Sequence, residues 1–268
     1  YGILGPVAAY AISPIIIILV FGSILIKRIF PGFLKSKFIY EGKLFKKISR
    51  YSIFAMAAGV GMVILGYTDT ILLTYFSGLT SVALYNVALP TAKVLMYFPR
   101  SIAGILLPLI SELWAKKEKA LIREGIESLY KYTIIIIIPL VFMILSFSDL
   151  IINTLFGKDY VAASNALKIL SIGMIFAVLY VVNIDFFSGI GKPEINNIIV
   201  YSAALFNLVA NIIMIPIWGI MGAAISTTIS YFIMMIIGVA KIRRYVKIRF
   251  PVKIWAKTLI AGILFVAI

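Results

Sequence analysis

The stretch that decides the fold reads VALYNVALPTAKVLMYFPRSIAGILLPLIS and covers residues 82–111. It is mostly apolar and long enough to cross a bilayer, which takes roughly 20 apolar residues in a helix. Its middle third nevertheless carries Lys93 and Arg100. Asn86, Lys93 and Arg100 follow one another at intervals of about two helical turns, so we expect all three on one face of a continuous helix. Tyr97 falls beside the same stripe.

Cations at this depth are costly to hold in a membrane. At ~1.5 Å per residue, Lys93 lies ~20 Å from the start of the helix and Arg100 ~16 Å from its end, too deep to reach a headgroup layer easily. Such a charge costs at least ~2.5–3.5 kcal/mol and by default faces a water-filled cavity or a partner. We therefore predict a site for an anionic substrate, with Lys93, Arg100, Asn86 and Tyr97 as its binding residues. In the structural alternative, the two cations pair with Asp69 or with carbonyl groups and only hold the helices together.

The composition of the whole chain predicts an all-α polytopic membrane protein. Of its 268 residues, 63% are hydrophobic and the mean hydropathy is +1.10, values outside the range of soluble domains. The apolar runs provide about seven full spans plus a partial eighth. The net charge of +15 comes from Lys and Arg clusters between these runs, which the positive-inside rule explains, so no nucleic-acid partner is expected.

Neither Cys nor His occurs in the sequence. Their absence removes disulfides, thiolate nucleophiles, histidine bases and the usual zinc ligands together. We therefore expect no catalytic residue, no metal site and no cofactor, and we interpret the protein as a non-enzyme.

The segments that connect the apolar runs are alternately basic and nearly uncharged along the chain. The segments rich in Lys and Arg are 27–50, 112–123, 190–193 and 241–253, and nearly uncharged segments lie between them at 77–81, 148–160 and 216–220. By the positive-inside rule, the basic segments are cytoplasmic and residue 1 is outside. Every span then crosses in the direction that its neighbours require, which predicts a multi-pass protein of the plasma membrane.

Few other polar groups lie within the apolar runs. Asp69 lies in the outer third of the second span, inside the stretch GYTDTILL. Asn207 and Asn211, spaced i, i+4, favour hydrogen bonding between helices over an ion site. Asn183 and Tyr180 could line a cavity, but interhelical hydrogen bonding is the expected role of both. Asp185, near the cytoplasmic end of the fifth span, is expected to be solvated. Small residues that recur every four positions predict a close-packing helix face at Gly222, Ser226 and Ser230.

Four stretches in succession resemble a known family. The first is GYTDTILLTYFSGLTSVALYNVALPTAKVLMYFPRSIAGILLPLISEL, with Asp69 before the outer turn, Gly78 and Tyr85-Asn86 after it, and Pro108 and Ser111 at the inner end. LFGKDYVAASNALKIL, GIGKPEINN and FNLVANIIMIPIWGIMGAAISTTISY continue the pattern, so the resemblance covers roughly residues 44–245. Together they resemble polysaccharide biosynthesis membrane proteins, the lipid-linked oligosaccharide flippases of the multidrug/oligosaccharidyl-lipid/polysaccharide (MOP) exporter superfamily.

The resemblance implies that the chain is a segment of a two-lobed, MATE-like transporter fold. Residues 1–26 would be the last helix of the first lobe, and 27–47 a cytoplasmic linker between the lobes with an amphipathic end. Residues 48–240 would form the second six-helix lobe, and 241–268 a basic cytoplasmic segment with the start of an extra helix.

The resemblance also implies a function. Such proteins move polyprenyl-pyrophosphate-linked oligosaccharide from the inner to the outer leaflet by alternating access, for polysaccharide and glycan export. Intramembrane cations would hold the pyrophosphate, and Lys93 and Arg100 lie where such cations are expected. The partners would be the lipid-linked glycan, membrane lipids and glycan-assembly membrane proteins. Asp69 is the candidate for ion coupling, either by competing for Lys93 and releasing the substrate or by responding to a coupling cation.

Three alternatives stay open. A drug/cation antiporter of the same superfamily would need a cavity with net acid, whereas the intramembrane balance here is basic. A membrane glycan polymerase or glycosyltransferase typically needs carboxylates or histidines near a large extramembrane loop, and this chain has no His and no outer loop longer than about a dozen residues. A non-transporting scaffold for glycan synthases would not need Lys93 or Arg100.

Overall fold

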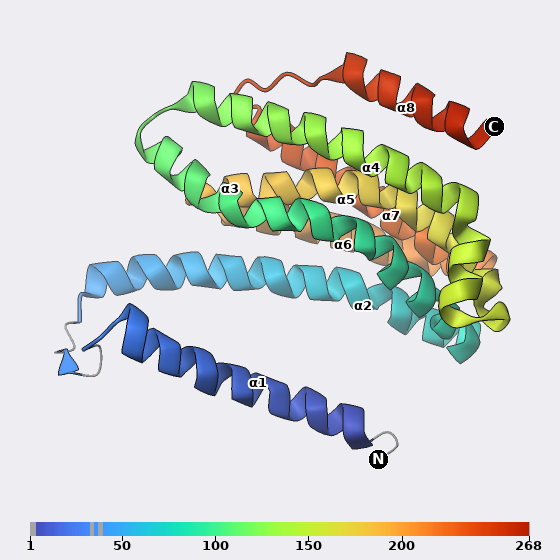
Figure 1. Cartoon of the computed structure of the whole chain (residues 1–268), viewed down its shortest axis with the longest axis horizontal. Coiled ribbons are helices and arrows are strands. Elements are labelled where there is room, and N and C mark those ends of the chain that lie inside the picture. Colours follow the sequence, from blue (N-terminus) through green and yellow to red (C-terminus); the bar gives the residue numbers. More distant parts are fainter. Residues whose placement is uncertain (1–3, 33–34, 37–39, 268) are drawn as a thin grey trace. The chain divides into compact units, whose positions relative to one another are not determined.

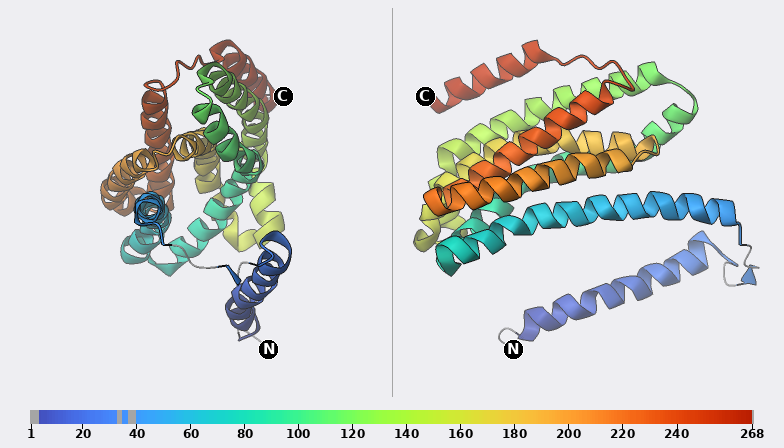
Figure 2. Two further views of the ribbon diagram at one scale, coloured as in Figure 1. Left: turned by 90° about the vertical axis from the view of Figure 1, so that its left-hand side faces the viewer. Right: turned by 180° about the vertical axis from the view of Figure 1, so that it is seen from behind.

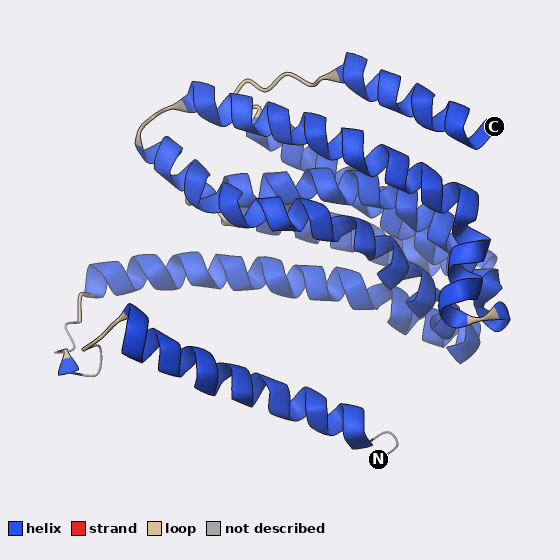
Figure 3. Cartoon of the chain, viewed as in Figure 1, coloured by secondary structure: helices blue, strands red, loops and turns tan. Residues whose placement is uncertain are grey.

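The computed structural model describes residues 4–32, 35–36 and 40–267. Within these ranges the chain consists of helices joined by turns and short connections, with no strand (Figure 3). The predicted all-α class is therefore confirmed. The chain divides into two compact units, Tyr1–Lys47 and Ile48–Ile268, and the boundary lies in the second turn of the helix α2, Gly42–Lys93.

The first unit contains α1, Leu4–Ile24, which continues as one turn of π-helix, Leu25–Ile29. α1 carries no charged residue, and large side chains such as Ile18 and Phe21 are exposed. A helix that is apolar on all sides suits a lipid environment, in which exposed hydrocarbon carries no penalty.

The long helix α2, Gly42–Lys93, reverses direction at Gly78, whose φ of 78° and ψ of 173° belong to a region that essentially only glycine adopts. In Figure 1 the chain runs out along the first part of α2 and returns through α3, Tyr97–Ala115. The reversal lies in the short turn predicted at 77–81. It makes α2 a helical hairpin whose two arms can exchange side-chain contacts.

The returning arm differs from the prediction. One continuous helix over 82–111 is wrong, because α2 ends at Lys93 and a 3-10 turn, Val94–Met96, separates it from α3. The cause is Pro99, which has no N–H and whose ring collides with the carbonyl group four residues earlier in a regular α-helix. A 3-10 turn has three residues per turn instead of 3.6, so the face that follows it is rotated.

The remaining helices form a bundle around α5. They are α4 (Lys119–Phe156), a 3-10 turn (Lys158–Ala163), α5 (Ser164–Gly189), α6 (Glu194–Trp218), α7 (Ile220–Ile242) and α8 (Val252–Ala267). α5 packs against α3, α4 and α7, while α6 lies along α7 and α8 lies along α4 (Figures 1 and 2). α5 is therefore buried over most of its surface, as its fully buried Leu167, Phe186 and Phe187 illustrate.

Small residues set the closest helix contacts. A Cβ on Gly61 of α2 would lie 2.7 Å from Cγ1 of Val200 in α6. Nearby, the hydroxyl of Tyr201 donates a hydrogen bond of 2.8 Å to the carbonyl oxygen of Ala57. On α7, a Cβ on Gly222 would collide with the backbone of Met214 in α6, which confirms the predicted close-packing face at this position.

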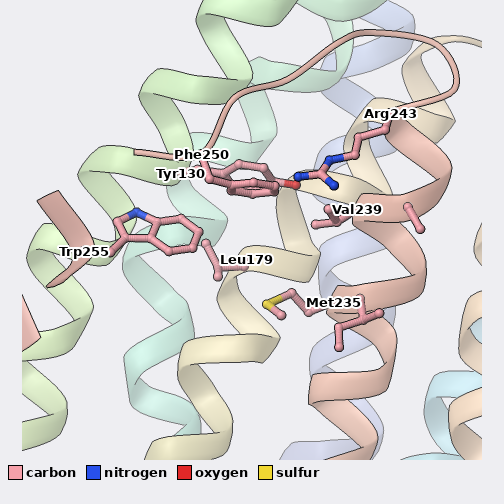
Figure 4. A pocket seen from close by; sticks show the side chains of 9 residues that line it. Tyr130, Leu179, Met235, Val239, Arg243, Phe250 and Trp255 are labelled. Atoms are coloured by element: carbon pink, nitrogen blue, oxygen red, sulfur yellow. The ribbon is translucent and has the colours of Figure 1, made fainter. Parts of the chain in front are cut away.

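The connection between α7 and α8 is fastened to the bundle by aromatic side chains (Figure 4). Phe250 stacks on Tyr130 of α4 with ring centroids 5.5 Å apart, and the guanidinium of Arg243 lies 5.1 Å from the Phe250 ring. The backbone N–H of Arg249 donates a hydrogen bond of 2.6 Å to Glu127. The pocket between these rings has a mainly apolar lining, with Arg243 at one side.

In the part of the chain that the structure describes, six helices are long and apolar enough to cross a membrane when α2 is counted once with the 3-10 turn that follows it. The protein is therefore a multi-pass membrane protein. The predicted seven spans plus a partial eighth, and the assignment of residues to two lobes, stay predictions.

Candidate functional site

The second unit encloses a cavity of about 650 Å³ between α2, the start of α3, α5 and α7. Asn86, Lys93 and Arg100, three of the four predicted binding residues, line this cavity. They come from the returning arm of the α2 hairpin and from α3. The break before α3 therefore does not separate the two cations.

In the part of the chain that the structure describes, no acid forms a salt bridge with either cation. Lys93 is half-buried and Arg100 is exposed, and among the described residues neither forms a salt bridge or a hydrogen bond. The salt bridges that the described residues do form, Lys116–Glu112 and Arg123–Glu127, lie outside the cavity. This geometry disagrees with the structural alternative in which Lys93 and Arg100 pair with Asp69, and it leaves both cations available to an anion.

Asn86 and Tyr97 differ in their surroundings. The side-chain oxygen of Asn86 accepts a long hydrogen bond of 3.5 Å from Thr70 on the other arm of the hairpin, and Asn86 borders the cavity. Tyr97 is 69% exposed and is not among the residues that line the cavity. Tyr97 is the first residue after the 3-10 turn, so the turn removes it from the stripe that the regular spacing predicts.

Asp69 lies beside the cavity at the centre of a buried polar cluster. Its Oδ2 accepts hydrogen bonds from the hydroxyl groups of Tyr85, at 2.5 Å, and Thr227, at 2.6 Å. Its Oδ1 accepts a bond of 2.6 Å from the amide of Asn211, which also donates to Oδ1 of Asn207 at 3.0 Å. All five side chains are buried, and they join α2, α6 and α7.

The cluster explains why Asp69 leaves the cations of the cavity free. Three donors satisfy the carboxylate, so it needs no Lys or Arg partner. The predicted interhelical hydrogen bonding of Asn207 and Asn211 is confirmed. Their connection to Asp69, and the part that Tyr85 and Thr227 take in the cluster, were not predicted. A signal existed for Tyr85, because Asp69 and Tyr85 stand nine and seven residues from the reversal at Gly78 and so face each other across the hairpin.

α5 contributes to the cavity wall two polar side chains with atoms that form no hydrogen bond to a described residue. Tyr180 and Asp185 both border the cavity. The Tyr180 hydroxyl and Oδ2 of Asp185 are buried, and no described residue forms a hydrogen bond with either. The prediction that Asp185 is solvated is therefore wrong for this oxygen, because α5 lies inside the bundle and not at its surface. The expected interhelical hydrogen bond of Tyr180 is also wrong among the described residues, and the alternative that Tyr180 lines a cavity is confirmed.

Comparison with known proteins agrees with this architecture. An uncharacterized membrane protein of Methanocaldococcus jannaschii is 40% identical over 96% of this chain and 51% of its own length. The "Probable low-salt glycan biosynthesis flippase Agl15" of Haloferax volcanii is 25% identical over 76% of this chain and 43% of its own length. The chain thus spans about half the length of the curated relatives that it matches.

A solved structure has the same fold. The lipid II flippase MurJ in its inward closed conformation superposes with a TM-score of 0.68 at 19% identity, over 88% of this chain and 50% of that one. The predicted resemblance to a family of lipid flippases is confirmed by a family match over most of the chain. Residues 25–268 match the family described as "Lipid II flippase MurJ", and the chain belongs to that family.

Proposed function

We propose that the protein moves a polyprenyl-pyrophosphate-linked oligosaccharide from the inner to the outer leaflet by alternating access, for glycan export. The observation that carries the proposal is that Lys93 and Arg100 line one cavity and that no described residue pairs with either. A pyrophosphate that crosses a low-dielectric layer needs compensating charge. Arg offers a planar fork of donors that matches phosphate oxygens, and Lys offers a mobile point charge.

Asp69 and its partners are proposed as the coupling site. Oxygen atoms of Asp69, Thr227 and Asn207 converge in a buried place around the amide nitrogen of Asn211, and hard cations such as Na⁺ prefer oxygen ligands. The cluster shares two helices with the cavity. Thr70, next to Asp69, borders the cavity, and so does Tyr231, one helical turn after Thr227. A cation that draws α2 and α7 together would therefore change the cavity wall, which links the two sites energetically.

The proposal extends to the setting of the protein. We place it in the plasma membrane, with the basic segments 27–50, 112–123, 190–193 and 241–253 in the cytoplasm and residue 1 outside. Lipid-linked glycan, membrane lipids and glycan-assembly membrane proteins are its partners. It acts as a transporter and not as an enzyme.

The drug/cation antiporter is a weaker candidate for the same cavity. A cationic substrate would meet Lys93 and Arg100, whereas the cavity wall offers only Asp185 as a carboxylate among the described residues. The balance of charge therefore favours an anion.

The test is a flipping assay on the full chain reconstituted in vesicles with a fluorescent lipid-linked oligosaccharide. Lys93→Ala and Arg100→Ala should each slow flipping about tenfold or more, because a hydrogen bond to a charged group contributes about 1.5–3 kcal/mol. Lys168→Ala is the matched control, since Lys168 lies in α5 but does not border the cavity. Wild-type rates in both cavity variants, at normal yield and folding, would refute the proposal.

A further inference from the structure

One face of α5 forms a wall of the cavity. Ala177, Tyr180, Val181, Ile184 and Asp185 all border it, and their spacing of three, one, three and one is that of a single helical stripe. Tyr180 and Asp185 are the two polar side chains of this stripe. They therefore face the same space as Lys93 and Arg100 but come from a different helix.

Both polar side chains of the stripe have unused hydrogen-bonding capacity. The Tyr180 residue is only 2% exposed, and its hydroxyl has no partner among the described residues. Oδ2 of Asp185 is also buried and has no partner among the described residues. Other carboxylates of the chain, such as those of Asp69 and Glu127, do accept hydrogen bonds. Buried polar atoms in proteins are almost always paired, so two unpaired ones on one cavity wall point to a ligand that pairs them.

The chemistry of these two groups does not fit a pyrophosphate. An ionised carboxylate only accepts hydrogen bonds, and a phosphate oxygen does the same, so Asp185 and a pyrophosphate would repel each other. Lys93 and Arg100 form no ion pair with Asp185 either. The cavity thus presents two kinds of surface, a cationic one from α2 and α3 and a hydrogen-bonding one from α5.

We propose that Tyr180 and Asp185 bind hydroxyl groups of the sugar that is attached to the pyrophosphate. A sugar hydroxyl donates to the Asp185 carboxylate and exchanges a hydrogen bond with the phenol of Tyr180, which both donates and accepts. This assignment rests on the proposed function, because it takes the pyrophosphate to lie at Lys93 and Arg100. It makes α5 the helix that distinguishes a glycosylated carrier lipid from the bare one.

The test compares two soluble probes on the purified full chain in detergent, farnesyl pyrophosphate and the same lipid carrying one N-acetylglucosamine on its pyrophosphate. Wild-type protein should bind the glycosylated probe more tightly. Asp185→Ala should weaken binding of the glycosylated probe about tenfold, the loss of one hydrogen bond to a charged group, and leave farnesyl pyrophosphate unchanged or slightly tighter. Tyr180→Phe keeps the ring. It should weaken the binding of the glycosylated probe alone, by a smaller factor than Asp185→Ala does.

Two controls separate this proposal from the proposed function. Lys93→Ala should weaken the binding of both probes. Asp149 is an exposed carboxylate of α4, and Asp149→Ala should weaken the binding of neither. An equal loss for both probes in Asp185→Ala, or no loss in either cavity variant of α5, overturns the sugar subsite while leaving Lys93 and Arg100 intact as the anion site. Wild-type protein that binds neither probe contradicts the proposed function, and the sugar subsite with it.

Discussion

Asp69 is a buried carboxylate that forms no salt bridge with a described residue and is instead stabilised by hydrogen bonds. Three donors from three other residues supply the compensation that an ion pair would otherwise provide, and hydrogen bonds to a charged group are about twice as strong as neutral ones. This arrangement has a consequence for function. Because Asp69 forms no salt bridge with Lys93 or Arg100, both cations stay available to an anion.

Neutralising Asp69 tests its role in coupling. Asp69→Asn keeps the size of the side chain but removes the charge that would attract a coupling cation. We expect flipping by the reconstituted full chain to lose its response to an imposed sodium or proton gradient. Asp149→Asn, at an exposed position of α4, is the control. A gradient response in Asp69→Asn equal to that of the wild type would exclude Asp69 as the coupling residue.

Tyr85 should contribute to stability through the same cluster. Tyr85→Phe removes the hydroxyl that donates to Asp69 and leaves the fully buried ring in place. The expected cost is about 1.5–3 kcal/mol in the free energy of unfolding, because the lost donor served a charged group. Thermal unfolding in detergent measures it. Tyr75→Phe, at an 81% exposed position of the same helix, should change stability by less than about 0.5 kcal/mol; equal effects of the two variants would contradict the importance of the cluster.

At the scale of elements, the contact between α6 and α7 depends on a missing side chain. Gly222 lies against the backbone of Met214, so a Cβ there meets atoms that cannot rotate away. α6 and α7 carry the Asn207, Asn211 and Thr227 side chains of the polar cluster. Their spacing therefore determines whether the cluster closes around Asp69.

Gly222→Ala should separate the two helices at this end. We expect a loss of about 1–3 kcal/mol in the free energy of unfolding, which is typical of overpacking. Gly59→Ala is the matched control, since nothing lies within 4 Å of a Cβ at that position of α2. Alanine is the better helix former, by about 1 kcal/mol, so the control should be neutral or stabilising. If Gly222→Ala unfolds at the same temperature as Gly59→Ala, the close approach does not limit the packing of α6 on α7.

At the scale of the whole molecule, the unit Ile48–Ile268 alone supplies both the cavity and the Asp69 cluster. α2 and α7 contribute to both. A change in their separation would alter the two sites together, and by linkage the substrate and the coupling cation would then influence each other's affinity equally.

The orientation of the molecule in the membrane has a direct test. The sequence contains no Cys, so single cysteines can be introduced without a background from these residues. Leu79→Cys, in the α2 reversal, should react with a membrane-impermeant maleimide added outside intact cells, and Lys247→Cys, after α7, should react only once the membrane is opened. Both positions are exposed. Labelling of Lys247→Cys in sealed cells would contradict the proposed topology and support the inverse orientation.

The sequence by itself was enough to determine the helical membrane class and the family resemblance, and to group Lys93, Arg100 and Asn86, which line one cavity in the structure. Hydropathy, charge distribution and helical spacing are properties of a single segment, and they can be read without knowing its neighbours. Only the tertiary structure decided that Tyr97 leaves the stripe, that Asp69 is enclosed by Tyr85, Asn211 and Thr227, and that Asp185 borders the cavity. Each of these depends on which helix lies opposite, or on how a proline-induced turn rotates the next one. Thr227 and Asp69, for example, are separated by 158 positions in the chain, and no local pattern records that they meet.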